Sequence, residues 1–564
     1  MRRPGFPDSS ARRCSSALGV GLLALFLASC GGGDNGGASG GEVAGGGNHN
    51  TFTGAAPGGT LIFLSEGEPD DLNPLTFDAT ESYQIVHLTF RALARRDSTL
   101  SSYVPDLLAS WEQPDSATVI MRVRPGLKWH DGEPVTAQDV VFTIERQKDP
   151  RTASPRQQDV GSVESVRAVD SATVEVKLNR TGPSVVNALL EVIPVPKHVL
   201  DSVPPERMRF SGFGQRPVGN GLFRMGPWQK GQQLTVVANE AAAARPALDR
   251  IIMRVVPDPT ARITELLNGN GDLTKIAAHQ SRQLENARGV EIHSAAQVRP
   301  AWITWNTSRP PVNDANVRRA FLMAVNRQQI VQGLFGQHGR AALSPIPPRL
   351  REHSADVRPL PYDPAGAGRL LEQAGWRDTN GDGIREKNGQ PLRLEVEYSA
   401  ADPIRGDVLV AMQAQVRQAG IQLVPRSYER TTWVERLRGR QFMGSFWGWG
   451  WGPGVMGPNA EMVFHSRSIP PNGPNFAGYR SPRVDALIDS ILVENDTTRA
   501  RGLWRQFEQQ VIDDAVYAPI FLDPEFYAVN ARFGNVEFRG PEWWEDVIFW
   551  HVPPDRRLPR DRAR

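Results

Sequence analysis

The chain contains very little cysteine. Its 564 residues include only Cys14 and Cys30, both close to the N-terminus. The rest of the chain can therefore form neither a disulfide nor a thiolate metal site. With no covalent cross-link available, we expect its stability to come from the packing of apolar side chains in two or three domains.

Further absences exclude several classes of function. The sequence contains neither the glycine-rich loop of P-loop nucleotide sites nor the His-Glu-x-x-His pair of zinc hydrolases, and its ten histidines are scattered. Beyond the first 30 residues, no apolar run approaches the roughly 20 residues that span a bilayer. The formal charge is +2, and without residues 1–29 the chain has 60 basic and 61 acidic side chains. This balance gives no reason to expect a nucleic-acid partner.

The N-terminus has the pattern of a secretory signal. Four arginines precede an apolar run over residues 17–28, and the run ends in Leu27-Ala28-Ser29-Cys30. These four residues resemble the bacterial lipobox, in which the cysteine is lipidated and becomes the new N-terminus. We therefore predict a signal peptide over residues 1–29 and a lipid anchor at Cys30, on the periplasmic or extracytoplasmic face of a membrane. An ordinary signal peptide followed by a chance cysteine is the alternative.

Residues 30–59 are composed as a tether. Glycine, alanine, serine and asparagine dominate this stretch, and Val43 and Phe52 are its only larger apolar residues. A segment of this composition cannot bury a core, so we expect it to be disordered. As a flexible coil of about 29 residues, it would reach roughly 30 Å from its anchor.

The remaining residues alternate between strand and helix patterns. Period-two alternation predicts strands near residues 61–63, 119–123, 174–178 and 392–398. Capping residues predict helices that begin after Thr136, Asp314, Asp363 and Ser481, and proline follows two of these caps. The interleaving of the two patterns favours an α/β fold.

Several longer motifs carry a resemblance to a known family. They are Val104–Glu112, Arg122–Phe142, Val218–Phe223, Trp305–Asp314, Val317–Arg327, Tyr362–Trp376 and Tyr479–Ile488. In this order they resemble the family 5 extracellular solute-binding proteins, which are the dipeptide, oligopeptide and nickel receptors of ABC importers. The resemblance extends from about Thr60 to His551.

The resemblance implies a two-lobed periplasmic-binding-protein-like fold of type II, cluster C, with an extra inserted subdomain. On this basis, lobe I is expected over residues 60–83, 215–299 and 520–556. The inserted subdomain is expected over 84–214, lobe II over 300–519, and a tail over 557–564. The implied function is a monomeric, membrane-anchored receptor that captures a peptide-like solute between its lobes. It would deliver the solute to a permease and its ATPase, without a cofactor or catalysis of its own.

A tryptophan-rich segment is the main candidate for ligand binding. Trp447, Trp449 and Trp451 alternate with glycines over residues 446–454. Such a loop suits the presentation of flat aromatic faces in a cleft, and packing under neighbouring loops is the alternative. In the peptide-binding members, the corresponding loop carries an aspartate that pairs with the ligand's α-amino group. This chain has Gly450 or Gly452 there, so stacked indoles suit a sugar ring or an apolar peptide side chain equally well.

The resemblance adds four more candidates for ligand binding. Thr80 and Tyr83 follow the first predicted strand, where family members place ligand contacts. Asn306 lies where the chain would enter the second lobe. Trp433 is the fourth, and a packing role on one face of a helix suits it at least as well.

The sequence leaves further interpretations open. Residues 378–384, Asp-Thr-Asn-Gly-Asp-Gly-Ile, resemble the start of a calcium loop, but the twelfth position holds Gly389 instead of glutamate, which favours a structural turn without metal. The competing functions are an oligosaccharide receptor of the same family and a receptor that signals through a membrane partner. A secreted glycosidase with paired carboxylates represents the enzyme class.

Overall fold

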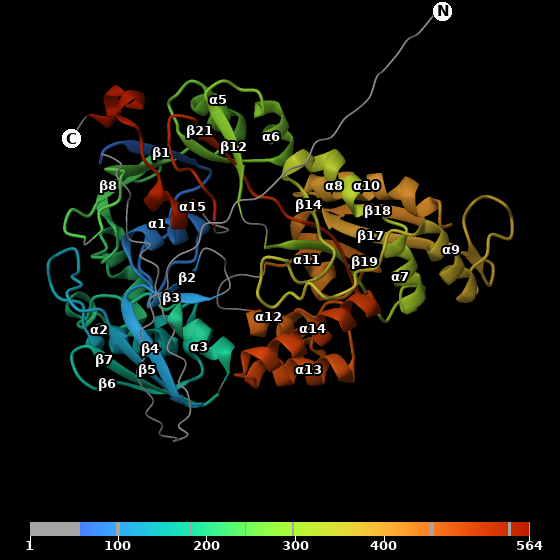
Figure 1. The fold of residues 1–564 in the computed structure, drawn as a ribbon, viewed down its shortest axis with the longest axis horizontal. Helices are drawn as coiled ribbons and strands as arrows, with labels where there is room; N and C mark the ends of the chain where they lie inside the picture. The colour runs from blue at the N-terminus through green and yellow to red at the C-terminus, as the bar shows by residue number, and fades with distance from the viewer. Residues whose placement is uncertain are drawn as a thin grey trace, which may run out of the picture. The chain divides into compact units, whose positions relative to one another are not determined.

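A computed structural model of the chain describes residues 57–97, 102–180, 182–242, 244–295, 298–450, 456–539 and 543–562. All of them belong to one compact unit, which begins at Thr51 (Figure 1). Cys30, the predicted signal peptide, residues 31–56 of the predicted tether and Trp451 lie outside the described residues. Gly58 and Gly59, at the end of the predicted tether, are buried, and the Gly58 N–H donates to the Ala247 carbonyl at 2.9 Å. Within the described part of the chain, no helix is both long enough and apolar enough to cross a membrane.

The first large sheet has seven strands and mixes early, middle and late parts of the chain. Its order is β12 (Val290–Ser294), β21 (Phe526–Asn530), β11 (Leu273–Ile276), β1 (Thr60–Ser65), β10 (Arg250–Val255), β9 (Gln233–Ala238) and β8 (Phe223–Gln229). The central strand β1 is parallel to β10 and β11. All six of its residues are buried, as expected for a strand covered on both faces.

The second large sheet has six strands. Its order is β14 (Arg340–Ala341), β20 (Tyr517–Leu522), β13 (Pro300–Trp305), β19 (Gly444–Gly448), β17 (Arg393–Ser399) and β18 (Gln422–Tyr428). The chain passes from the first sheet to the second between β12 and β13, and it returns between β20 and β21. The two connections are joined, because the backbone N–H of Asp523 donates to the Arg299 carbonyl at 2.7 Å.

A smaller antiparallel sheet lies between β1 and β8 in sequence. Its order is β4 (Leu108–Asp115), β5 (Thr118–Val123), β7 (Thr173–Leu178) and β6 (Val163–Ala168), and a separate pair is formed by β2 (Ala94–Arg96) and β3 (Tyr103–Pro105). Helix α2 (Ala137–Lys148) packs on β6 and β7 (Figure 1). The core of this sheet is continuous with that of the first large sheet, since Val119 and Leu61 belong to one buried cluster.

The predicted strand and helix patterns are confirmed at these positions. The four alternating patterns correspond to β1, β5, β7 and β17, and the four caps precede α2, α7 (Ala315–Met323), α9 (Pro364–Gln373) and α13 (Pro482–Val493). The caps act as their chemistry dictates: the Asp363 carboxylate accepts from the Gly366 N–H at 2.7 Å, and the Ser481 hydroxyl accepts from the Val484 N–H.

The other helices are distributed over the two large sheets and the inserted segment. They are α1 (Thr80–Thr89), α3 (Pro183–Leu190), α4 (Lys197–Leu200), α5 (Pro259–Leu267), α6 (Ala278–Leu284), α8 (Arg327–Phe335), α10 (Pro403–Arg417), α11 (Arg430–Arg438), α12 (Met456–Phe464), α14 (Thr497–Asp514) and α15 (Trp543–Asp546). Helices α8 and α10 pack on β14 and β18 of the second sheet, whereas α1 packs against β8 and α15 (Figure 1). Helix α15, close to the C-terminus, therefore lies beside α1, more than 450 residues earlier in the chain.

Candidate functional site

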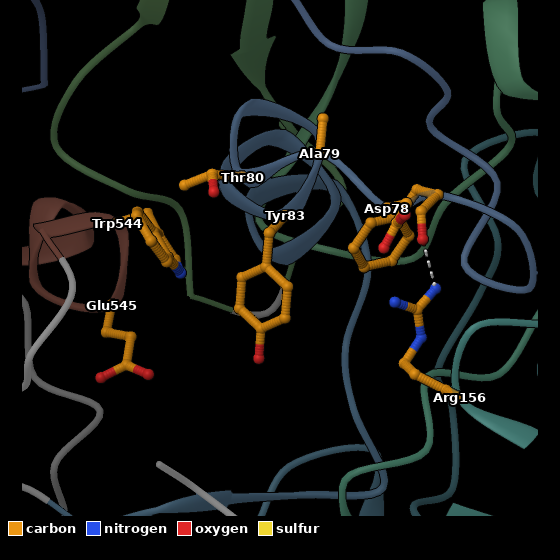
Figure 2. A pocket seen from close by; sticks show the side chains of 8 residues that line it. Asp78, Ala79, Thr80, Tyr83, Arg156, Trp544 and Glu545 are labelled. Carbon is orange, nitrogen blue, oxygen red and sulfur yellow. Dashed lines mark hydrogen bonds between the residues drawn. The ribbon is translucent and has the colours of Figure 1, made fainter. Parts of the chain in front are cut away.

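A pocket of about 290 Å³ opens at the N-terminal end of α1 (Figure 2). It is built from three segments that are far apart in sequence: the loop and helix after β1, one residue of the inserted subdomain, and α15. The lining residues are Phe77, Asp78, Ala79, Thr80, Tyr83, Arg156, Trp544 and Glu545. A concave site with apolar walls and a few polar groups is the usual form of a small-ligand site.

Asp70 holds the loop that leads into α1. Its carboxylate accepts hydrogen bonds from the Ser82 hydroxyl at 2.6 Å and from the backbone N–H of Ala79 at 3.1 Å. Partial burial alone would raise the pKa of Asp70, but these hydrogen bonds outweigh burial and hold the pKa below its ordinary value. A charged Asp70 therefore fixes the start of α1, and with it the position of Thr80 and Tyr83.

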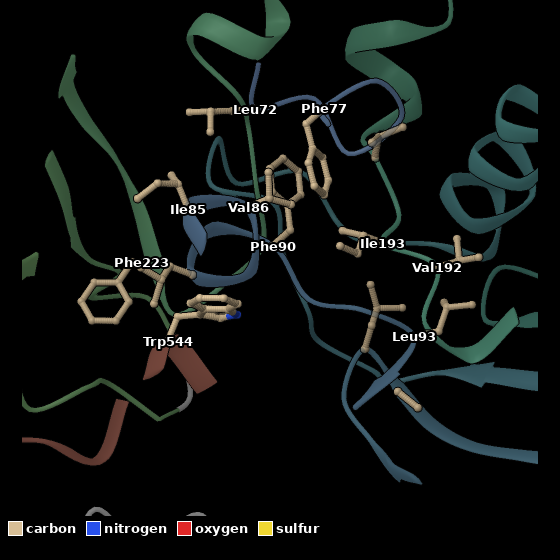
Figure 3. Packing of buried hydrophobic residues seen from close by; sticks show 14 of the residues in the cluster. Leu72, Phe77, Ile85, Val86, Phe90, Leu93, Val192, Ile193, Phe223 and Trp544 are labelled. Carbon is tan, nitrogen blue, oxygen red and sulfur yellow. The ribbon is translucent and has the colours of Figure 1, made fainter. Parts of the chain in front are cut away.

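Aromatic rings form one wall of the pocket. The Tyr83 ring stacks on His87 with a centroid distance of 3.9 Å, and it meets Phe77 and Trp544 edge-on at 5.8 Å and 5.9 Å. Two of these rings, those of Phe77 and Trp544, also belong to the buried cluster that contains Ile85 of α1 (Figure 3). The wall is therefore anchored in the core, which gives the pocket a preformed shape.

Opposite charges occupy the two ends of the pocket. Figure 2 shows Glu545 at one end and Arg156 at the other, with Tyr83 between them. The Arg156 guanidinium donates to the carbonyls of Pro74 and Phe77 and lies 3.7 Å from the centroid of the Phe77 ring. Burial lowers the pKa of Arg156. The Glu545 side chain is exposed, but the protein around it and the nearby carboxylates raise its pKa to about 7.

The structure brings two of the sequence-predicted site residues into this pocket, namely Thr80 and Tyr83. Trp544, Glu545 and Arg156 complete the pocket but were not singled out from the sequence. The run Trp543-Trp544-Glu545-Asp546 was the available signal, because paired indoles beside two acids are unusual near the end of a chain. No comparable signal marks Arg156.

The tryptophan-rich segment lies in a different place, at the end of β19. Trp447 is 7% exposed, its indole N–H donates to the Thr304 hydroxyl at 2.7 Å, and it packs edge-on against Trp302. Trp449 is half-buried, and its ring meets that of Trp447 at 5.6 Å. Of this pair, Trp449 therefore offers the larger surface to a ligand.

Asn306 and Trp433 also make defined contacts with the protein. Asn306 is 1% exposed, and its side-chain amide donates to the carbonyls of Arg440 and Phe442 and accepts from the Ser308 hydroxyl. Trp433 is half-buried on α11, and its indole N–H donates to Ser445 at 3.1 Å. Neither residue lines the pocket at α1.

The acidic turn over residues 378–386 uses its carboxylates internally. Carboxylate oxygens of Asp378, Asp382 and Glu386 lie within 4.8 Å of one another. Asp378 accepts from the backbone N–H groups of Gly381 and Gly383, and Glu386 accepts from that of Thr379. These bonds account for the conformation of the turn.

Two large sheets joined by two crossing segments define a two-lobed binding protein, and the comparisons with known proteins agree. Residues 102–470 match the bacterial extracellular solute-binding proteins, family 5 (middle part). The chain belongs to this family, whose members are transport binding proteins and not enzymes.

Individual relatives cover most of the chain. A Brucella ovis protein named as an ABC transporter peptide-binding protein is 30% identical over 442 residues, which are 77% of this chain and 81% of the relative. The oligopeptide-binding protein AppA of Bacillus subtilis is 27% identical over 542 residues, covering 93% and 97% of the two chains.

Two solved structures illustrate the shared fold. AppA from Bacillus subtilis in complex with a nonapeptide is 25% identical, with a TM-score of 0.68, and the match covers 88% of this chain and 99% of AppA. NikZ from Campylobacter jejuni in complex with Ni(L-His) is 24% identical, with a TM-score of 0.70, and the match covers 87% and 99%. The predicted family and the two-lobed α/β fold class are thus confirmed.

Proposed function

We propose that this chain is the receptor of an ABC importer that captures a peptide-like solute on the extracytoplasmic side of a membrane. The observation that carries the proposal is the pocket at α1, because a preformed aromatic wall with a few charged groups suits a peptide side chain or terminus. Relatives named for peptide binding support the same class of ligand. Binding favours a closed state of the lobes, which docks on a permease, and the partner ATPase supplies the energy for uptake.

The proposed function assigns each segment of the chain to a lobe, to the inserted subdomain or to the tail. Lobe I consists of residues 60–83, 215–299 and 520–556, with residues 84–214 as an inserted subdomain, and lobe II consists of residues 300–519. The chain acts as a monomer, and residues 557–564 form a tail. Trp449 contacts the ligand from lobe II, in addition to Thr80 and Tyr83.

The ligand class is tested with the native full chain. Mass spectrometry of ligand that co-purifies with the protein, followed by calorimetry with the identified compound, should yield peptides. Thr80→Arg fills the pocket and should abolish binding. Thr260→Arg is the matched control, because Thr260 is also an exposed threonine in the first turn of a helix but lies outside the pocket. Equal affinity of wild type and Thr80→Arg for the ligand would show that the ligand binds outside this pocket.

An oligosaccharide is the second candidate ligand, and the half-buried indole of Trp449 favours it. Aromatic faces stack on sugar rings as readily as they pack on apolar side chains. The same co-purification separates the two candidates: a saccharide in the bound fraction, with no peptide, would replace the first proposal.

The anchor at Cys30 belongs to the same proposal. Lipidation after cleavage of residues 1–29 would hold the protein at the membrane through the segment over residues 30–59. Cys30→Ser should move the protein from the membrane fraction to the soluble fraction with its melting temperature unchanged. A wild-type protein that is soluble and carries no lipid would contradict the anchor while leaving the ligand proposal intact.

A further inference from the structure

Glu545 lines the pocket, and its side chain is exposed to solvent (Figure 2). Among the described residues that line the pocket, Arg156 is the basic one, and it lies at the other end. The guanidinium of Arg156 is also committed to the Pro74 and Phe77 carbonyls. The Glu545 end of the pocket therefore has negative charge without a matching cation among the lining residues.

Four neighbouring charged groups also act on this carboxylate. The groups that act on Glu545 are the carboxylates of Asp546 and Glu191 and the guanidiniums of Arg95 and Arg96. Desolvation by the surrounding protein, followed by repulsion from the two carboxylates, raises the pKa of Glu545 to about 7 in spite of the arginines. A cation that binds in the pocket would therefore stabilise the charged form of this carboxylate.

Two aromatic rings form a corner beside this carboxylate. The rings of Tyr83 and Trp544 meet at 64° with a centroid distance of 5.9 Å, so a cation in the corner would lie near both rings. Trp544 is 3% exposed, and its indole nitrogen has no hydrogen-bond partner among the described residues. Figure 2 shows this nitrogen on the side of the ring that faces Tyr83. A buried donor without a partner is costly, and an acceptor atom on the ligand would satisfy it.

We propose that this pocket binds a positively charged group of the ligand, an ammonium or a guanidinium, with Glu545 as its counter-ion and Tyr83 and Trp544 as its aromatic neighbours. This inference rests on the proposed function, which identifies the ligand as a peptide. It narrows the expected ligands to peptides that carry a cationic group. Glu545 then supplies the carboxylate that the tryptophan-rich segment lacks at Gly450. An acceptor next to the cation, such as a peptide carbonyl, takes the N–H of Trp544.

The first test uses the isolated cationic group as the probe. Titration calorimetry of the full chain with butylguanidinium chloride at pH 8 should show binding, whereas 1-pentanol, a neutral molecule of similar size, should bind much more weakly. Glu545→Gln should reduce the affinity for the cation about 10- to 100-fold, as expected for the loss of a charge-assisted hydrogen bond. Glu545→Asp keeps the charge and should retain most of the affinity. Glu285→Gln removes an exposed carboxylate at the end of α6 and should change nothing.

The pH dependence gives an independent readout. The cation must compete with the proton on Glu545, so affinity should rise as the pH increases from 6 to 8, and binding near pH 7 should release protons into the buffer. Glu545→Gln should lose both effects. Equal affinities of wild type and Glu545→Gln for butylguanidinium, or no binding of the cation by wild type, would overturn the proposal.

Peptides separate this inference from the proposed function. A library of peptides with lysine should bind more tightly than the same library with norleucine, and Glu545→Gln should remove the difference. Peptide binding without a lysine preference would overturn the cation site and leave the peptide receptor standing. If butylguanidinium binds through Glu545 but no peptide binds, the cation site stands and the peptide ligand is wrong.

Discussion

At the scale of single residues, the contacts that a side chain makes within the protein determine whether it can also contact a ligand. Trp447 and Trp449 are two positions apart in one strand and its extension, yet Trp447 is buried with its N–H bonded to Thr304, and Trp449 is half-buried. The alternation with glycine indicated an unusual aromatic segment but could not separate these two environments. That separation depends on Trp302 and Thr304 of β13, which are remote in sequence.

We predict different outcomes for substitutions of the two tryptophans. Trp447→Ala should destabilise the protein by about 3–5 kcal/mol, because it opens a cavity next to Trp302. Trp449→Ala should cost less stability and about 1–3 kcal/mol of ligand binding, as truncation of an aromatic contact does. Thermal melting and calorimetry with the co-purified ligand measure the two quantities. If Trp449→Ala binds the ligand with the affinity of wild type, neither tryptophan contacts the ligand and both serve packing.

The charge of Glu545 should also reduce stability at neutral pH. The pKa of Glu545 is raised to about 7 in the folded protein, whereas an unfolded glutamate titrates near 4.5. Between these values the folded state holds the extra proton, so this group's contribution to stability is lost as the pH rises from 4.5 through 7. Because the Glu545 side chain is exposed, Glu545→Gln should raise the melting temperature only slightly at pH 8 and leave it nearly unchanged at pH 4. An equal shift at both pH values would contradict the raised pKa.

At the scale of helices and strands, local signals predicted the elements well but not their assembly. Caps and alternation located α9, α13, β5 and β17 because each signal lies within a few residues of the element it defines. The pocket at α1 could be predicted only in part, through Thr80 and Tyr83. Its other wall comes from α15, more than 450 residues later in the chain, and nothing local indicates that the two helices meet.

The same limit applies to the buried ion pairs that fasten the two ends of the described chain. Arg532, after β21, bonds to Asp272 at 2.9 Å and to Asp561 at 2.6 Å. Asp561 also accepts from the backbone N–H of Thr60 at the start of β1. One guanidinium thus connects the first described strand with the C-terminal segment.

We predict that Arg532→Met destabilises the protein by about 3–5 kcal/mol, because it leaves the buried carboxylate of Asp561 without its counter-charge and leaves Asp272 with Arg560 alone. Arg122→Met is the control: Arg122 pairs with Glu112 at 2.9 Å, but both side chains are about half exposed, so its loss should cost about 0–1 kcal/mol. Urea denaturation of the two variants measures the difference. Equal free energies of unfolding would mean that burial adds nothing to the Arg532 network.

At the scale of the whole molecule, function depends on the two crossings between the large sheets. The segments after β12 and before β21 are joined through Arg299 and Asp523, and the Asp523 carboxylate also pairs with Arg405 of α10 at 3.0 Å. Because only these two segments connect the sheets, they are the positions at which we expect the lobes to rotate. A ligand that binds both lobes then shifts the population toward the closed state.

Gly182 allows a direct test of this closure. It precedes α3 of the inserted subdomain with a φ of +129°, and a Cβ at this position would lie 1.9 Å from the carbonyl oxygen of Leu492 in α13. A side chain at residue 182 should therefore hold the inserted subdomain and the second lobe apart. Gly126 has a φ of +78° with no atom within 4 Å of such a Cβ, so it provides a control with a strained backbone but open space.

We predict that Gly182→Leu weakens binding of the co-purified ligand by about tenfold or more, because the closed state becomes less populated. In wild type and in Gly126→Leu, the ligand should reduce the radius of gyration in X-ray scattering. It should also add about 2.7 kcal/mol of stability at a hundredfold excess over the dissociation constant. In Gly182→Leu the scattering curves with and without ligand should nearly coincide. If this variant binds and compacts like wild type, the approach of α3 to α13 is not part of the closed state, and closure must proceed through other contacts.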